Sequence, residues 1–201
     1  MIAIIDYDAG NIKSVEKALI SLGEEAVMTR DKEVILAADK VILPGVGAFG
    51  DAMEKIRGYG LEEVIKEVID KGTPFLGICL GLHLLFEESE ETPGVKGLGI
   101  LKGKVIKISE DQGLKVPQIG WNSLKFPNKG KLFKGIKEDS YVYFVHSYYL
   151  KAEDESIVTA TTDYVVNVHA SVEKYNVFAC QFHPEKSSEV GLAILKNFIE
   201  L

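Results

Sequence analysis

Residues 74–86 read PFLGICLGLHLLF, an apolar run that is interrupted by one cysteine between two glycines. The segment that ends at Cys79 is typical of a buried strand, and the segment after it predicts a helix. Gly77 and Gly81 complete the pattern G-x-Cys-x-G, which lets a chain turn sharply from strand to helix and exposes the central side chain. The stretch therefore predicts a nucleophilic thiol at the carboxyl end of a strand, where open α/β sheets bind their ligands.

The helix expected after Cys79 supplies partial positive charge and free N–H groups, and both favour the reactive thiolate. Taken alone, the pentapeptide fits equally well with a small apolar side chain that fills a turn, since free cysteine is among the most buried residue types.

The sequence around this stretch predicts alternating strands and helices. Strand-like runs occur at residues 1–7, 25–30, 40–45 and 74–79, with helical periodicity after most of them and a break near Gly58 and Gly60. From Gly97 onward strand-like segments dominate until a final helix over residues 188–201. We predict an α/β fold with an open, largely parallel sheet flanked by helices, and additional antiparallel strands in the second half.

Composition narrows the class of protein. The chain has 201 residues, 46% of them hydrophobic and 26% charged, which predicts one soluble globular domain over residues 1–201. The net charge of -7 argues against nucleic-acid binding. Cys79 and Cys180 lack metal-ligand spacing, and no apolar run approaches the ~20 residues of a membrane span. We expect a cytoplasmic protein with no leader peptide, no membrane contact, no metal and no cofactor.

A base for the thiol is found in the segment FHPEKSS. His183 and Glu185 follow a buried, strand-like run, so they are expected at the same edge of the sheet as Cys79. If the chain stays extended through Pro184, both side chains project to one side, and Glu185 fixes the imidazole tautomer. The pattern is also that of a surface histidine beside a solvated glutamate, but together with the cysteine turn it favours a Cys-His-Glu triad.

The segment PGVGAFG follows another predicted strand and opens on the same edge. Gly45 and Gly47 permit unusual backbone angles, so peptide N–H groups of this loop and of Leu80 form a predicted oxyanion hole. A phosphate-binding loop is the competing interpretation, and the absence of G-x-G-x-x-G and of G-K-[ST] argues against it.

These motifs, P-G-x-G, G-x-C-x-G and H-P-E in this order, resemble those of the class I (triad) glutamine amidotransferases. The segments DYDAGNIKSV, PGVGAFGDAM, LLFEESEE, GWN, YFVHSYY and HPEKSS further resemble the glutaminase subunits of imidazole glycerol phosphate synthases. The resemblance implies that Cys79 attacks the carboxamide of glutamine and that His183, oriented by Glu185, shuttles protons. It assigns the oxyanion hole to Val46, Gly47 and Leu80.

The resemblance also implies a set of substrate contacts: Gly47, His83, Glu91, Ser147 and Tyr148. A carboxylate at Glu91 suits the substrate ammonium, although an acidic run is also typical of a solvated helix end. His83 departs from the family, which more often has glutamine there, but histidine keeps a donor and an acceptor. His146 and His169 lie in strand contexts and are expected to be structural.

Free ammonia is mostly protonated near neutral pH and escapes into solvent, and the sequence predicts no second domain that would use it. The resemblance implies a heterodimer with the cyclase subunit of imidazole glycerol phosphate synthase, a (β/α)8 barrel that receives ammonia through an internal channel. With the ribulotide PRFAR this partner forms imidazole glycerol phosphate and AICAR. The expected interface residues are Asn11, Trp121, Tyr143 and Lys186.

Three alternatives remain at this stage. The chain is compatible with another glutaminase of the class, such as the subunit of pyridoxal-phosphate synthase or anthranilate synthase, but the flanking segments argue against both. It is also compatible with a stand-alone cysteine hydrolase or peptidase of flavodoxin-like fold. A catalytically dead binding module is the third, and the intact Cys79, His183 and Glu185 argue against it.

Overall fold

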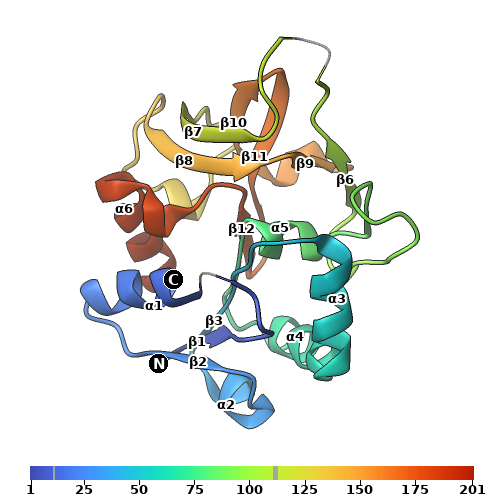
Figure 1. Cartoon of the computed structure of the whole chain (residues 1–201). Coiled ribbons are helices and arrows are strands. Elements are labelled where there is room, and N and C mark those ends of the chain that lie inside the picture. The colour runs from blue at the N-terminus through green and yellow to red at the C-terminus, as the bar shows by residue number, and fades with distance from the viewer. Residues whose placement is uncertain (11, 111–112) are drawn as a thin grey trace.

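The computed structural model describes residues 1–10, 12–110 and 113–201, and its centre is a seven-stranded sheet (Figure 1). The strand order is β10-β11-β12-β4-β3-β1-β2. Strands β2, β1, β3, β4 and β12 are parallel, and β11 pairs antiparallel with both β12 and β10. The predicted fold class is therefore confirmed. The strands are β1 (Ile2–Ile5), β2 (Ala26–Thr29), β3 (Lys40–Leu43), β4 (Phe75–Ile78), β10 (Val158–Tyr164), β11 (Val166–Lys174) and β12 (Val177–Cys180).

Helices cover both faces of the sheet because the buried strands present apolar side chains in both directions. On β1, Ala3 and Ile5 pack into the core beneath α2 to α5, whereas Ile2 and Ile4 pack into the core beneath α1 and α6. The helices are α1 (Ile12–Ser21), α2 (Lys32–Ala37), α3 (Phe49–Gly58), α4 (Leu61–Asp70), α5 (Leu80–Leu84) and α6 (Ser188–Ile199). The predicted break near Gly58 and Gly60 separates α3 from α4.

Two smaller sheets are built from the second half of the chain. One has the order β5-β6-β9, and the other is the antiparallel pair β7-β8. Their strands are β5 (Glu88–Ser89), β6 (Gly103–Lys107), β7 (Gln118–Ser123), β8 (Tyr141–His146) and β9 (Tyr148–Ala152). Short 3-10 turns complete the fold: η1 (Lys131–Phe133), η2 (Glu155–Ile157) and η3 (Pro184–Lys186).

The run YVYFVHSYYL, which looks like one strand in the sequence, is two strands in different sheets. It is divided at Ser147, so β8 pairs with β7 and β9 pairs with β6. The division places Ser147 and Tyr148 where two sheets diverge, and no glycine or proline marks it.

The turn at Cys79 depends on its two glycines. Cys79 has φ 53° and ψ -105°, an unfavourable conformation for a residue with a side chain. A Cβ on Gly77 would lie 2.8 Å from the carbonyl carbon of Gly81, and a Cβ on Gly81 would lie 1.8 Å from the carbonyl oxygen of Leu43. Only glycine at both positions lets α5 pack this closely onto the ends of β3 and β4.

Four neighbouring strands, β12, β4, β3 and β1, end at one edge of the sheet, and the segments that follow them meet there. The register places Cys180 opposite Ile78 and Leu43 opposite Gly77, so the predicted motifs leave the sheet at nearly the same level. In the described part of the chain, no helix has the length and apolarity needed to span a bilayer.

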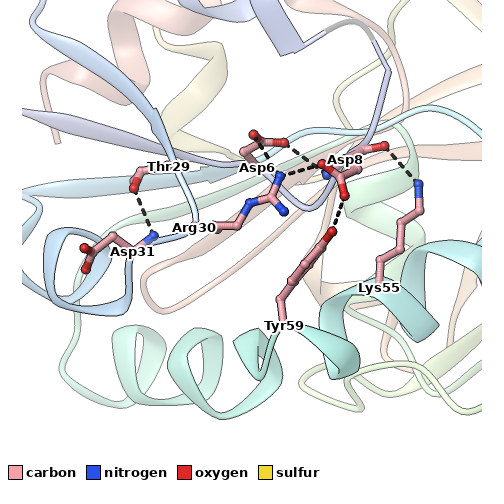
Figure 2. A network of polar contacts seen from close by, with 7 residues as sticks. All are labelled: Asp6, Asp8, Thr29, Arg30, Asp31, Lys55 and Tyr59. Carbon is pink, nitrogen blue, oxygen red and sulfur yellow. Dashed lines mark hydrogen bonds and ion pairs between the residues drawn. The ribbon is translucent and has the colours of Figure 1, made fainter.

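An ionic network fixes the segment after β1 (Figure 2). The guanidinium of Arg30 donates to the carboxylates of Asp6, at 3.3 Å, and of Asp8. Tyr59 also donates to the Asp8 carboxylate, and the Lys55 ammonium donates to the Asp8 carbonyl at 3.1 Å. The hydrogen bonds from Arg30 and then Tyr59 lower the pKa of Asp8. Residues 6–8 are thereby tied to β2 and α3 beside the edge where the motifs meet.

Candidate active site

A cavity of about 380 Å³ lies at this edge of the sheet, and all five residues predicted for substrate binding line it. Most of its wall comes from the loop after β3, the turn at Cys79 and the junction of β8 and β9, and Glu91 and Pro117 complete it. The lining residues are Val46, Gly47, Cys79, Leu80, His83, Glu91, Pro117, Val145, His146, Ser147 and Tyr148. A cavity of this size suits an amino acid or another small polar ligand.

Cys79 contributes the only described thiol in the cavity wall. The residue is 7% exposed, and its backbone N–H donates a 2.8 Å hydrogen bond to the carbonyl of Cys180 on β12. Cys180 itself is fully buried, and burial raises its pKa, so it stays a protonated, unreactive thiol.

His183 and Glu185 lie behind Cys79 and form the expected pair. Nδ1 of His183 is 2.8 Å from Oε1 of Glu185, and both side chains are almost completely buried. The predicted backbone conformation behind this contact, an extended chain through Pro184, is wrong, however. The chain does not stay extended through Pro184 but forms the turn η3, and this turn brings the carboxylate back to the imidazole. Gly191 of α6 packs against η3 so closely that a Cβ there would lie 1.9 Å from the carbonyl oxygen of Pro184.

The electrostatic environment makes His183 a strong base. Burial lowers its pKa, but hydrogen bonding and charge interactions with Cys79 and Glu185 outweigh that effect and raise the pKa to about 9. Nε2 of His183 makes no hydrogen bond of regular geometry to a described residue, and Cys79 is the group that interacts with the ring on the side away from Glu185. The imidazolium therefore carries a positive charge that interacts with the Glu185 carboxylate and with the Cys79 sulfur.

The predicted oxyanion residues line the cavity, but their donors are not all available. Val46 and Gly47 lie in its wall, and Gly47 has φ 109°, a left-handed backbone that favours glycine. The N–H of Leu80 donates a 3.3 Å hydrogen bond to the carbonyl of Gly45. An oxyanion that used the Leu80 N–H would have to displace this carbonyl.

Two residues hold the loop after β3 and the start of α3, and one of them, Tyr7, is not predicted from the sequence. The buried hydroxyl of Tyr7 donates a 2.9 Å hydrogen bond to the carbonyl of Pro44, and burial raises the pKa of Tyr7, so it remains a donor. The carboxylate of Glu91 accepts a 2.8 Å hydrogen bond from the N–H of Phe49 at the start of α3. Glu91 is therefore engaged with the protein as well as facing the cavity.

His146 supports the far wall of the cavity, as its predicted structural role requires. Its Nδ1 is 2.9 Å from the carbonyl of Tyr148, and its Nε2 is 2.9 Å from Oε1 of Gln118. Burial lowers its pKa to about 4, so the ring is neutral near pH 7. His169 lies elsewhere, where its Nδ1 accepts a 3.2 Å hydrogen bond from the N–H of Ala152.

His83 contacts a residue that the sequence analysis missed. Its Nε2 is 2.6 Å from Oε1 of Gln181, and Nε2 of Gln181 lies 3.8 Å from Sγ of Cys79. In the sequence Gln181 continues the strand-like run before the H-P-E segment, but β12 ends at Cys180. Gln181 therefore lies one residue beyond β12, the strand that pairs with the strand before Cys79.

The predicted interface residues lie near the cavity where they are described. Trp121 and Tyr143 face each other across β7 and β8 with ring centroids 6.2 Å apart, and Lys186 is exposed in η3. Asn11 lies outside the described residues. Among residues 1–10, 12–110 and 113–201, no cluster of His, Cys, Asp and Glu side chains has the grouping needed to bind a metal ion.

Comparison with known proteins agrees with this geometry. The family "Glutamine amidotransferase class-I" matches residues 3–201, and the chain belongs to this family. Among curated relatives, a Methanocaldococcus jannaschii protein is 51% identical over 201 residues, covering all of both chains. A Bacillus cereus protein is 54% identical over 198 residues, covering 98% of this chain and 93% of its own. Both are named imidazole glycerol phosphate synthase subunit HisH.

Solved structures agree on the fold. A crystal structure described as a glutamine amidotransferase superposes with a TM-score of 0.78 at 23% identity, covering all of this chain and 98% of that one. The structure of PurLQS from Thermotoga maritima gives a TM-score of 0.74 at 20% identity, covering 99% and 97%.

His183 should have a much higher pKa than His83 and His146. We expect a pKa of about 9 for His183 and about 4 for His83 and His146, measured from imidazole ¹⁵N shifts during a pH titration. Glu185→Gln should lower the pKa of His183 by about one unit or more, because the ring loses its anionic partner. An unchanged His183 titration in this variant would show that Glu185 does not tune the ring.

The raised pKa of His183 also makes the free energy of unfolding depend on pH. The pKa of His183 is higher in the folded protein than its ordinary 6.5, so the protonated ring stabilises the fold below that pH. This contribution is lost as the pH rises through about 9. Glu185→Gln should therefore lower the free energy of unfolding more at about pH 6 than at about pH 10.

Proposed function

We propose that residues 1–201 form one glutaminase domain that hydrolyses the side-chain amide of L-glutamine at Cys79 and supplies the ammonia to a cyclase subunit in histidine biosynthesis. The observation that carries this proposal is the thiol of Cys79 in the cavity wall, with His183 and its partner Glu185 behind it. The family membership and the names of the relatives support the same reaction.

In the first half of the reaction, the thiolate of Cys79 attacks the side-chain carbonyl carbon of glutamine. A carbon–sulfur bond forms, and the carbonyl oxygen takes up negative charge beside the loop of Val46 and Gly47. His183, protonated near neutral pH, gives its Nε2 proton to the amide nitrogen, the carbon–nitrogen bond breaks, and ammonia leaves. A γ-glutamyl thioester remains on Cys79.

In the second half, the now neutral His183 takes a proton from a water molecule that attacks the thioester. The carbon–sulfur bond breaks, glutamate leaves, and the imidazolium–thiolate pair is restored. Glu185 keeps the Nδ1 proton in place throughout, so that only Nε2 exchanges protons. We assign the glutamine head group to Glu91, Ser147 and Tyr148, with Gly47 and His83 also lining the site.

The proposal includes a gate at the loop after β3. In the structure the N–H of Leu80 donates its hydrogen bond to the Gly45 carbonyl, so this oxyanion donor is not available. A peptide flip within Gly45–Gly47 would turn the carbonyl away and aim N–H groups at the substrate. The open left-handed backbone at Gly47 makes such a flip sterically feasible. Partner binding that favours the flipped loop would raise turnover.

An exposed apolar face lies next to the cavity and supports a docking surface for the partner. On one side of the β7-β8 pair, Ile119 is 63% exposed, Trp121 is 50% exposed and Tyr141 is 58% exposed. Val145 pairs with Ile119 on this face and also lines the cavity, so the two features are continuous. A protein that covers this face would lie over the mouth of the site.

We propose that this partner is a (β/α)8-barrel cyclase that forms a heterodimer with the chain and receives ammonia through an internal channel. It converts PRFAR into imidazole glycerol phosphate and AICAR. The relatives are named as one subunit of imidazole glycerol phosphate synthase, which supports a second subunit. Because Cys79 must stay a free thiol, we place the complex in the cytoplasm.

The first test is a glutaminase assay of the wild type and of Cys79→Ala, with and without a cyclase subunit and its ribulotide. Cys79→Ala should lose about 10⁴-fold or more of the activity, because no other described group can form the thioester. Cys180→Ala is the matched control and should keep its turnover. For the wild type, partner and ribulotide should raise kcat more than they lower KM. Equal rates with and without the partner would contradict the gate, and an active Cys79→Ala would contradict the mechanism.

The second test concerns docking. Trp121→Ala should weaken binding of the cyclase by about 30-fold, since a central, desolvated tryptophan typically contributes about 2 kcal/mol at an interface. The control is Tyr175→Ala, because Tyr175 is 84% exposed but precedes β12 and lies at the opposite edge of the sheet. Binding measured by titration calorimetry that is unaffected by Trp121→Ala would exclude this face as the interface.

A further inference from the structure

Gln181 is the described amide side chain that contacts the thiol. It follows β12 directly, and because Cys180 pairs with Ile78, Gln181 and Cys79 leave neighbouring parallel strands at the same level. Gln181 is completely buried, and its Nε2 donates to Sγ of Cys79 at 3.8 Å. The side-chain amide of Gln181 thus contacts the Cys79 sulfur through its nitrogen and His83 through its oxygen.

The contact with His83 determines which end of the amide faces the sulfur. Nε2 of His83 lies 2.6 Å from Oε1 of Gln181, and burial lowers the pKa of His83 to about 4. The neutral ring donates to this oxygen only in the tautomer that carries its proton on Nε2. With Oε1 held there, the amide NH₂ points to Sγ, whereas the reversed amide would place its oxygen against the thiolate.

We propose that Gln181 is a catalytic residue that donates a hydrogen bond from its amide to the Cys79 thiolate, and that His83 is a positioning residue that holds Gln181 in this orientation. The inference rests on the proposed role of Cys79 as the nucleophile. A donor to the charged form stabilises the thiolate, and a neutral donor does so without contributing a second proton to the reaction.

This arrangement gives His83 a second role beside the expected one. From the resemblance, His83 is expected to contact the substrate in place of the usual glutamine, and the ring does line the cavity. Its Nε2 contacts Gln181, so this part of its effect on catalysis passes through the sulfur.

Other titratable groups also act on Cys79, and they come from several elements. His183, protonated near neutral pH, is the cation among them, and the buried Tyr7 hydroxyl and Cys180 thiol are neutral. The titratable side chains that interact with Cys79 are Tyr7 after β1, Cys180 on β12 and His183 after β12. Those that line the cavity with it are His83, Glu91, His146 and Tyr148. Because the positive charge of His183 also stabilises the thiolate, the contribution of Gln181 is measured as a shift on top of it.

The test is the pH dependence of alkylation of Cys79 by iodoacetamide in the full chain, with peptide mapping to separate Cys79 from Cys180. Gln181→Met keeps the size of the side chain but removes the donor. It should move the midpoint of the alkylation profile about one pH unit higher, which makes alkylation at pH values below the midpoint about tenfold slower. In the complex with the cyclase, kcat should fall while KM changes about twofold or less.

A pair of His83 variants supplies the matched control. His83→Gln keeps a donor for Oε1 of Gln181 and should keep the wild-type alkylation profile. His83→Phe removes the donor and should shift the profile in the same direction as Gln181→Met. The double variant His83→Phe with Gln181→Met should shift it no further than Gln181→Met alone, because His83 acts through Gln181.

A folded Gln181→Met chain with the wild-type profile would overturn the proposal. If Gln181→Met does not fold, the His83 pair decides, and identical profiles for His83→Gln and His83→Phe overturn it. Failure of the proposed function looks different: iodoacetamide would not label Cys79 at all, or Cys79→Ala would still hydrolyse glutamine.

Discussion

The turn at Cys79 depends on two contacts that leave no room for a side chain. The chain reverses from β4 into α5 within one residue, and Cys79 takes up an unfavourable backbone conformation to do so. The missing Cβ atoms of Gly77 and Gly81 allow α5 to lie against the backbone of β3. Because α5 is held there, Cys79 lines the cavity, and Leu80 and His83 reach the same cavity. The strain at one residue is thus compensated by close packing around it.

The parallel order of the sheet brings the rest of the site to that sulfur. Strands β12, β4, β3 and β1 are neighbours in the sheet, so the segments that carry the proposed base, the proposed nucleophile, the proposed oxyanion loop and Tyr7 lie side by side. Strand β8, which carries Tyr143, connects the site to the exposed apolar face. The ring of Tyr143 packs against Trp121, while its carbonyl accepts the N–H of His183 and its N–H donates to the hydroxyl of Ser187. A partner docked on Trp121 would therefore rest on the strand that positions the catalytic base.

Local motifs in the sequence were sufficient to predict the fold class and most residues of the site. The glycines around Cys79 and the H-P-E segment are short-range signals, and alternation of strands and helices predicts which strand ends meet. What the sequence did not reveal depends on long-range contacts. The division of residues 141–150 at Ser147 is decided by pairing with β6 and β7, and η3 is decided by packing against α6. Gln181 was hidden because its role depends on the register between β12 and β4.

The central claim is that Cys79 becomes acylated by glutamine. The most direct measurement is rapid acid quenching of the wild-type chain with glutamine, cyclase and ribulotide, followed by mass spectrometry of the peptides. The account predicts a γ-glutamyl group on the peptide that contains Cys79, removable by hydroxylamine, as expected of a thioester. Turnover of glutamine with no acyl group on Cys79 at any quench time, or with the group on another residue, would contradict it.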